Sequence, residues 1–255
     1  MEKLILITGA SSGLGEEFAF QLAAQGYSLL LVARRLERLQ YIQRDIIKKY
    51  ANVRVFCLCV DLNDASSGQQ IMDYISTQGL SLNGLINNAG FGQRGQFSEI
   101  ALSRQMEMLQ VNINSLVSLS HLAIPLLAKH EDSFIINVAS IAAFVAGPNL
   151  GVYYASKAFV LSFSQALYEE LKKQKIQVST LCPGATDTEF FEQANMPKSP
   201  LFKHFVMDKR PVVQYALANK HKAIVIPGFI NKISVLAVRF IPSFVARKLA
   251  YCIQK

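Results

Sequence analysis

Three side chains in one short stretch of the sequence have the right types to move a proton to or from an oxygen atom. They are the hydroxyl of Ser140, the phenol of Tyr153 and the ammonium of Lys157. Tyr153 and Lys157 are four residues apart, so on a helix they share one face about one turn apart. Ser140 follows an apolar run that is typical of a strand. A strand end and the next helix can meet at one crevice, so these groups are candidates for a catalytic site.

The proposed chemistry depends on the pKa of the tyrosine. A free tyrosine titrates near pH ~10 and is a poor acid or base at neutral pH. A neighbouring ammonium favours the phenolate, so we expect Lys157 to lower the pKa of Tyr153. Lowering it by ~3 units needs roughly 4 kcal/mol of differential stabilisation, within reach of a partly desolvated site. By itself the pattern is weak, because tyrosines on helices usually pack in cores and Ser140 could simply cap a strand.

A glycine-rich turn near the N-terminus is the second candidate site. Residues 8–15, TGASSGLG, follow an apolar run and precede an amphipathic stretch. Strand, glycine-rich turn and helix in this order are the context that a dinucleotide-binding loop needs. Gly9 permits the tight turn, Gly13 lets the backbone approach a pyrophosphate at the helix N-terminus, and Gly15 lets the helix pack closely on the strand. The alternative is an ordinary glycine-rich turn. We expect these residues of the turn to bind the cofactor: Gly9, Ser11, Ser12, Gly13, Leu14 and Gly15.

Two arginines follow the next apolar run, where NAD-binding domains place an acidic residue to hold the ribose 2′-hydroxyl. Arg34 and Arg35 suit instead the dianionic 2′-phosphate of NADP, so the sequence favours NADP (NADPH) over NAD. The alternative is that Arg35, with Glu37 and Arg38, begins a solvated helix face. That alternative is less plausible for Arg34, which comes directly off the strand end.

Polar and small residues follow the third and fourth apolar runs. The carboxylate of Asp61 could accept the adenine amino group, or it could cap the next helix. Small residues at the fourth strand end leave room for a flat ring, and asparagine side chains there can tie neighbouring strands together. We expect cofactor contacts from these residues: Asp61, Leu62, Asn88, Ala89 and Gly90. Asn112 lies in a largely apolar helix and must be hydrogen-bonded if it is buried, either as a packing residue or to bind a water near Lys157.

The composition excludes several classes of protein. Of the 255 residues, 51% are hydrophobic and 17% are charged, so a large core is affordable and disorder is not expected. The net charge of +8 indicates a solvated basic surface or attraction to an anionic cofactor, substrate or membrane. The scattered positive charges lack a nucleic-acid motif. No cysteine or histidine cluster has metal-ligand spacing, so no metal site is predicted. The thiols, and the lack of a signal peptide or spanning segment, favour a cytoplasmic location.

Apolar runs typical of buried parallel strands alternate with amphipathic stretches along the whole chain. The predicted strands cover 4–7, 28–32, 53–60, 85–86, 134–138, 177–181 and 223–226. The predicted helices cover about 13–25, 35–50, 65–76, 103–129 and 151–173. This alternation predicts an α/β fold: one Rossmann domain, residues 1–255, with a doubly wound parallel sheet of about seven strands and helices on both faces. Its ligand crevice should lie at the carboxyl ends of the strands.

Two further segments remain outside this alternation. The proline-containing segment 186–211 predicts a lid over the substrate, because a long loop inside a compact domain is usually functional. Its apolar residues favour a hydrophobic or amphipathic substrate, or simply close the lid on the core: Phe190, Phe191, Leu201, Phe202 and Phe205. The tail 229–255 predicts two amphipathic helices broken at Pro242. We favour packing of the tail on the domain, with a membrane-surface or subunit contact as the alternative.

In combination these motifs resemble the short-chain dehydrogenase/reductase family, in its form of ~250 residues that prefers NADP. The resemblance covers Thr8 to about Thr188 in order, and the combination at family spacing is highly specific. It rests on the following residues: Thr8, Gly9, Gly13, Gly15, Asp61, Asn87, Asn88, Ala89, Gly90, Asn112, Ser140, Tyr153, Lys157, Pro183 and Gly184. The family also implies a homo-oligomer, dimer or tetramer, and a small-molecule carbonyl or alcohol substrate.

The resemblance implies a role for each site residue. Tyr153 would donate a proton to the carbonyl oxygen in reduction, or remove one in oxidation. Lys157 would lower the pKa of Tyr153 and bind the nicotinamide ribose, and Ser140 would orient the carbonyl oxygen. Asn112 would hold a water that links Lys157 to solvent. Thr188 would contact the nicotinamide carboxamide, next to Pro183 and Gly184. Tyr154 is one residue out of register with Lys157 and is assigned no catalytic role.

The main hypothesis is therefore an NADP(H)-dependent oxidoreductase that moves hydride between nicotinamide and a carbonyl/alcohol pair. A second hypothesis is a dinucleotide sensor or interaction module that has lost catalysis. The complete set of Ser140, Tyr153 and Lys157 argues against it. A third is a sugar-nucleotide epimerase or dehydratase, whose glycine loop is usually spaced differently and whose C-terminal substrate domain is larger. The sequence does not identify the carbonyl compound.

Overall fold

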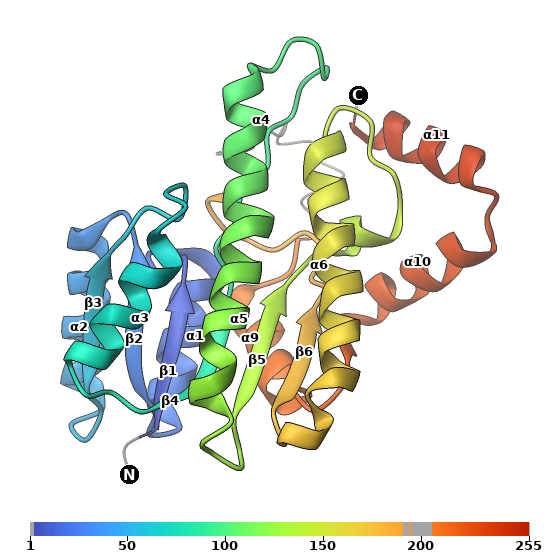
Figure 1. Cartoon of the computed structure of the whole chain (residues 1–255). Coiled ribbons are helices and arrows are strands. Elements are labelled where there is room, and N and C mark those ends of the chain that lie inside the picture. Colours follow the sequence, from blue (N-terminus) through green and yellow to red (C-terminus); the bar gives the residue numbers. More distant parts are fainter. Residues whose placement is uncertain (1–2, 191–193, 195–205, 255) are drawn as a thin grey trace.

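The computed structural model describes residues 3–190, 194 and 206–254, which form a parallel β-sheet with helices on both faces (Figure 1). The sheet has seven strands in the order β3-β2-β1-β4-β5-β6-β7, so the predicted Rossmann architecture is confirmed. The strands are β1 (Leu4–Thr8), β2 (Ser28–Ala33), β3 (Val55–Cys59), β4 (Leu82–Asn87), β5 (Phe134–Val138), β6 (Gln177–Leu181) and β7 (Ile224–Val225).

The helices form a layer on each face of the sheet. One apolar layer packs α1 (Gly13–Ala24), α2 (Leu36–Lys49) and α9 (Lys209–Ala218) against the strands. The opposite layer contains α3 (Ser67–Thr77), α5 (Ser115–Leu127) and α6 (Gly151–Glu170). Helix α4 (Leu102–Leu109) continues α5 beyond the sheet edge, and α10 (Phe229–Phe240) and α11 (Ser243–Gln254) lie outside the β6 side (Figure 1). Short 3-10 turns cover Ile141–Phe144 and Lys172–Gln174.

Strand β4 is longer than the apolar pair at 85–86 predicts. It begins at Leu82 and includes a polar residue and a glycine, which hide it from a hydrophobicity pattern. A Cβ added to Gly84 would lie 2.7 Å from Cδ1 of Ile5 and 2.8 Å from Cζ of Phe134. Glycine is therefore required here, because large side chains from the neighbouring strands meet over it.

The helix predicted over 103–129 is not continuous. A π-helical turn at Gln110–Asn114 separates α4 from α5, and Asn112 lies in the middle of it. Such single-turn bulges are frequent at functional sites because they redirect one side chain or carbonyl. The prediction of one uninterrupted helix was therefore wrong at this turn.

The segment predicted as a lid ends earlier than Pro211. Helix α9 begins at Lys209, where the Asp208 carboxylate accepts a hydrogen bond of 2.8 Å from the backbone N–H of Arg210. Pro211 fits the first turn of a helix, where its missing N–H has no partner to lose. Residues 191–193 and 195–205 lie outside the described residues, and with them Phe191, Leu201, Phe202 and Phe205.

In the part of the chain that the structure describes, no helix combines the length and the apolar character needed to cross a membrane.

Candidate active site

The predicted site residues converge at the carboxyl ends of the strands. They surround a cavity of about 1420 Å³, which is lined by the glycine-rich turn, the ends of β2 to β6 and the inner face of α10 and α11. Every residue predicted to bind the cofactor lines this cavity except Gly15, and Asn112 lies behind the wall. The volume exceeds the usual few hundred Å³ of a pocket for one small ligand. It can therefore hold a dinucleotide together with a substrate.

Two polar residues at the end of β5 and on α6 meet inside this cavity. The Ser140 side chain forms a hydrogen bond with the Tyr153 phenol. Ser140 is also held in place as the cap of a 3-10 turn, where its Oγ accepts from the Ala142 N–H at 3.1 Å. A substrate oxygen placed between the two hydroxyls would contact both.

Lys157 lies one turn further along α6 and is buried. Its Nζ donates to the carbonyl oxygen of Val138 at 2.8 Å and lies 5.8 Å from the centroid of the Tyr153 ring. A Cβ added to Gly90 would meet Nζ at 3.2 Å, so the glycine at the end of β4 leaves the ammonium open on that side.

The pKa of Tyr153 is raised above its ordinary value of 10.0, so the expectation that Lys157 lowers it is wrong in this structure. Burial is the largest cause, the hydrogen bond with Ser140 opposes it, and the neighbouring Tyr154 adds to it. Burial also lowers the pKa of Lys157 from 10.5 to about 8. Tyr153 therefore holds its proton at neutral pH, and Lys157 is close to losing one.

Asn112 fixes the loop after β4 against α6. Its Nδ2 donates to the Phe91 carbonyl at 2.9 Å and to Ser156 Oγ at 3.0 Å, while its Oδ1 accepts from the Phe91 N–H at 3.0 Å. Both N–H groups are used within the protein, so the packing interpretation accounts for its side chain. The same Oδ1 would lie 3.0 Å from a Cβ at Gly90.

A buried amide network ties the strand ends beneath the site together. Asn87 Nδ2 donates to Asn137 Oδ1 at 2.8 Å and to Ser120 Oγ at 3.1 Å, and Asn137 Nδ2 donates to Ser164 Oγ at 2.9 Å. The network joins β4 and β5 to α5 and α6, as expected for asparagines at this strand end. It fixes the two elements that carry Ser140 and Tyr153.

The glycine-rich turn has the tight geometry of a phosphate cradle. Gly9 and Gly13 have φ values of +63° and +59°, which other residues rarely adopt. A Cβ on Gly15 would collide with the carbonyl oxygen of Gly9, so Gly15 serves close packing as predicted. Ser12 precedes α1 without a side-chain cap to its backbone N–H groups. Those groups are available to an anion at the helix N-terminus.

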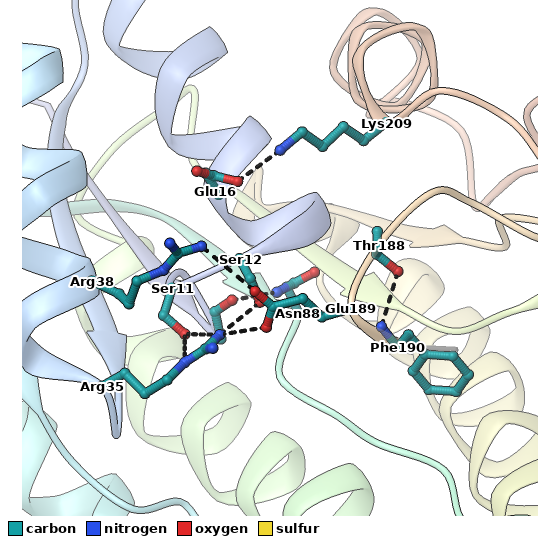
Figure 2. Close-up of polar contacts among 11 residues, drawn as sticks. Ser11, Ser12, Glu16, Arg35, Arg38, Asn88, Thr188, Glu189, Phe190 and Lys209 are labelled. Carbon is teal, nitrogen blue, oxygen red and sulfur yellow. Dashed lines mark hydrogen bonds and ion pairs between the residues drawn. The ribbon is translucent and has the colours of Figure 1, made fainter. Parts of the chain in front are cut away.

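The two arginines after β2 both line the cavity, and Figure 2 shows Arg35 against the serines of the glycine-rich turn. Arg34 is exposed and lines the cavity. Arg35 is held in place: its Nη2 donates to Ser11 Oγ at 3.1 Å and to Ser12 Oγ at 3.0 Å. The interpretation of Arg35 as a merely solvated helix residue is therefore wrong, because its guanidinium is fixed against the glycine-rich turn.

The remaining predicted contacts are placed as follows. Asp61 does not cap the next helix, since α3 begins only at Ser67; it accepts a hydrogen bond of 3.0 Å from the Asn63 N–H and lines the cavity. The Asn88 side chain donates to the carbonyl of Thr8 at 2.9 Å and so joins the ends of β1 and β4.

The residues around the cavity fit a nicotinamide dinucleotide. Backbone donors at the start of α1 suit a pyrophosphate, and cations at the β2 end suit an adenosine phosphate. A Cβ at Gly13 would meet Thr188 Cγ2 at 3.0 Å, so the glycine leaves just enough room between the turn and the opposite wall. This fit to a dinucleotide follows from the residues of the chain alone and does not depend on similarity to other proteins.

Several contacts of the site were not predicted by the sequence argument. The Phe190 ring lies 5.2 Å from the Tyr153 ring, centroid to centroid, and Tyr154 lines the cavity edge-on to Tyr153 at 6.1 Å. Glu189 forms ion pairs with Arg35 and Arg38. Phe190 was predicted as an apolar lid residue, but its contact with Tyr153 and that of Glu189 with the arginines join distant segments, so no local pattern predicts these contacts. The tail, which was expected to pack on the domain, contributes Ile230 and others to the lining of the cavity.

Comparison with known proteins identifies the family. The model of the short chain dehydrogenase family matches residues 3–199. The chain belongs to the short-chain dehydrogenase family. It is thus an oxidoreductase of the dehydrogenase/reductase type, with a nicotinamide dinucleotide as cofactor.

The similar proteins include enzymes of different substrate classes. Sulfoacetaldehyde reductase 2 of Chromohalobacter salexigens is 33% identical over 74% of this chain and 75% of its own. The very-long-chain 3-oxoacyl-CoA reductase of Mycosarcoma maydis is 32% identical over 69% of this chain and 51% of its own, so the match spans about half of that protein. A short-chain dehydrogenase from Sphingobium yanoikuyae, solved in complex with NADPH, superposes with a TM-score of 0.83 at 29% identity, covering 93% of each chain.

Proposed function

We propose that this short-chain dehydrogenase is an NADP(H)-dependent oxidoreductase that acts on a carbonyl/alcohol pair, with Tyr153 as the general acid and base. The observation that carries the proposal is the hydrogen bond between Ser140 and Tyr153 inside the cavity that the glycine-rich turn also lines. The bound cofactor supplies or accepts the hydride. The chain supplies the proton and the positions of the reacting groups.

In reduction, Ser140 and Tyr153 would both donate to the substrate oxygen, and the Tyr153 proton would move to it as the alcohol forms. Because its pKa is raised, the Tyr153 phenol carries its proton before the reaction begins, as a proton donor must. Lys157, with its pKa lowered to about 8, is suited to pass a proton back toward the phenolate. Asn112 would position Ser156 and the loop after β4 around the Lys157 ammonium.

NADP is the proposed cofactor because two arginines, and no acidic residue, follow directly after β2. Arg34 and Arg35 would bind the 2′-phosphate, Gly13 and its neighbours the pyrophosphate, and Asp61 the adenine amino group. Pro183, Gly184 and Thr188 line the opposite wall and would contact the nicotinamide end. The NADPH complex of the Sphingobium yanoikuyae relative supports this choice without deciding it.

A hydrophobic or amphipathic substrate is supported by the apolar wall of the cavity. Phe144, Phe190, Ile230 and Val238 line the part beyond Tyr153, and the tail helices extend that wall outward. The name of the Mycosarcoma maydis relative refers to a long acyl chain, which is consistent with such a wall. We also propose that residues 186–208, the part of the predicted lid that precedes α9, serve as the substrate lid of this single domain.

The direct test is consumption of NADPH and NADH by the purified protein against a panel of ketones, ketosteroids, acyl ketones and sugars. We expect turnover with NADPH on an apolar ketone and much weaker turnover with NADH. Binding of NADPH without turnover on any compound of a broad panel would favour the non-catalytic module instead. A preference for NADH would overturn the choice of cofactor while leaving the reaction class intact.

We propose a peripheral membrane contact for the tail. Between 229 and 254 the chain has four lysines and arginines and no acidic residue. Phe229, Leu236 and Phe240 are 77%, 55% and 81% exposed, and among the described tail residues with assigned burial only Val235 and Ala246 are buried. An exposed apolar and basic helix pair suits an anionic lipid surface.

Vesicle sedimentation tests this contact. We expect binding to phosphatidylglycerol vesicles and little binding to phosphatidylcholine vesicles, with loss on Phe240→Ser. Equal recovery in the supernatant with both vesicle types would contradict a lipid contact. A dimer or tetramer in light scattering that Phe240→Ser dissociates would assign the same face to a subunit contact. A cytoplasmic location remains a prediction from the sequence, and a homo-oligomer remains a prediction from the family resemblance.

A further inference from the structure

A carboxylate lies on Arg35, one of the two arginines that the proposed function gives to the cofactor, and on the neighbouring Arg38. Glu189 Oε2 is 2.9 Å from Arg35 Nη2, and Oε1 is 3.5 Å from Arg38 Nη2 (Figure 2). The same Arg35 nitrogen donates to Ser11 and Ser12 of the glycine-rich turn. An anion is therefore already bound where two guanidinium groups and two hydroxyls converge, and it belongs to the chain itself.

This carboxylate comes from the opposite wall of the cavity. Thr188, Glu189 and Phe190 follow β6, and we call these residues the strap. Its base is anchored where Thr186 forms a β-bridge to Met207, and Met207 N donates to the Ala185 carbonyl at 2.9 Å. The strap thus crosses from β6 toward α2, over the turn at which α1 begins.

The strap touches each part of the dinucleotide site in turn. Thr188 Cγ2 lies 3.0 Å from the position of a Cβ on Gly13, Glu189 reaches Arg35 and Arg38, and Phe190 lies on the Tyr153 ring. Three consecutive residues therefore connect the pyrophosphate cradle, the β2 arginines and the catalytic tyrosine. The ion pair is the polar anchor among these contacts.

We propose that Glu189 is an internal competitor for the cofactor's 2′-phosphate and so sets the preference between NADPH and NADH. The inference rests on the proposed role of the β2 arginines. A dianionic phosphate on Arg35 would face the Glu189 carboxylate at close range, and two anions repel strongly there. NADPH must displace Glu189 or share the arginines with it. NADH has a neutral hydroxyl at this place and leaves the ion pairs intact.

The ionisation of Glu189 is consistent with this role. Burial alone would raise the pKa of its carboxyl, but the hydrogen bond and charge of Arg35, with Ser12 and Arg38 adding to them, lower it overall. The side chain is therefore anionic at neutral pH. About a third to a half of each partner remains exposed, with 36% for Glu189, 44% for Arg35 and 50% for Arg38. Such a pair is weak enough for a ligand to exchange.

Binding measurements on Glu189→Gln test the proposal with the full chain. The probes are adenosine 2′,5′-bisphosphate and 5′-AMP, which differ only in the 2′-phosphate, followed by NADPH and NADH. We expect Glu189→Gln to tighten binding of the bisphosphate and NADPH by about three- to tenfold, and to change 5′-AMP and NADH by less than about twofold. The control Glu37→Gln removes an equal charge from the first turn of α2 and should change none of the four.

Two further arms make the outcome specific. In an Arg35→Gln background, Glu189→Gln should tighten NADPH much less, because the contested guanidinium is gone. Unchanged or weaker NADPH binding in Glu189→Gln, or an equal change for NADH, would overturn the inference. The wild-type affinities separately test the proposed cofactor. A wild type that prefers NADH would refute the NADP assignment, while a shift toward NADPH in Glu189→Gln would still support competition.

Discussion

Gly9→Ala should damage the protein through two separable effects. At φ +63° an alanine would sit in the left-handed region, at a cost of about 1–2 kcal/mol. Its Cβ would also lie 2.9 Å from Ala89 Cα and 2.9 Å from Asn88 Nδ2. Asn88 cannot turn away freely, because that nitrogen donates to the carbonyls of Thr8 and Gly9. Such overpacking adds about 1–3 kcal/mol.

The sum is a loss of about 2–5 kcal/mol in the free energy of unfolding, or a fall of about 5–15 °C in Tm for a chain of this size. Thermal and urea unfolding of the cofactor-free protein, followed by circular dichroism, measures it. Binding of NADPH should weaken as well, since the turn would have to open.

Gly26→Ala is the matched control. Gly26 has φ +84°, and a Cβ there would meet nothing within 4 Å, so only the conformational cost of about 1–2 kcal/mol applies. Gly151→Ala has neither penalty: its Cβ also meets nothing within 4 Å, and we expect little change. If Gly9→Ala lowered the free energy of unfolding no more than Gly26→Ala does, the cost assigned to the close approach between the turn after β1 and the end of β4 would be refuted.

Three more predictions concern the site. Arg34→Ala should raise the KM for NADPH about tenfold or more relative to that for NADH, from the loss of a charge-assisted contact; equal rises would refute the assignment. Asn112→Ala should lower the free energy of unfolding by about 2–3 kcal/mol, because it leaves the backbone N–H and C=O of Phe91 without their partners and removes the donor to Ser156 Oγ; an unchanged urea midpoint would contradict this. Lys157 has a pKa of about 8 when folded and 10.5 ordinarily, so the unfolded state binds more protons between these values. Between these pH values the free energy of unfolding of the wild type, relative to that of Lys157→Met, should therefore rise with pH by up to ~1.4 kcal/mol per pH unit. Parallel curves of unfolding free energy against pH for the two proteins would contradict this.

Much of the fold follows from local patterns in the sequence. Buried parallel strands are continuous apolar runs, so β1, β2 and β5 were predicted nearly to the residue. The glycine-rich turn lies between a strand and a helix that are both evident, so its place at the sheet edge was predictable. Strand β4 was underestimated because Gly84 is explained only by Ile5 and Phe134, which are remote in sequence.

The sequence predicted many of the residues that line the cavity, but not their pKa values. Tyr153 and Lys157 share a helix face as their spacing indicates, yet burial is the largest cause of both pKa shifts. The contact of Glu189 with Arg35 joins positions far apart in the chain, and no periodicity encodes it. Likewise the π-helical turn holds Asn112, whose side chain binds the remote Phe91 carbonyl, a contact that no local pattern encodes.

Turnover by Tyr153→Phe tests the central claim most directly. The assay is NADPH oxidation on whichever ketone the wild type reduces best, with NADPH affinity measured in parallel. Tyr154→Phe is the control, because it removes a neighbouring phenol from the same cavity. We predict that Tyr153→Phe lowers kcat by about 10²–10⁴-fold with NADPH still bound, and that Tyr154→Phe retains most activity. Undiminished turnover by Tyr153→Phe would contradict the proposed mechanism.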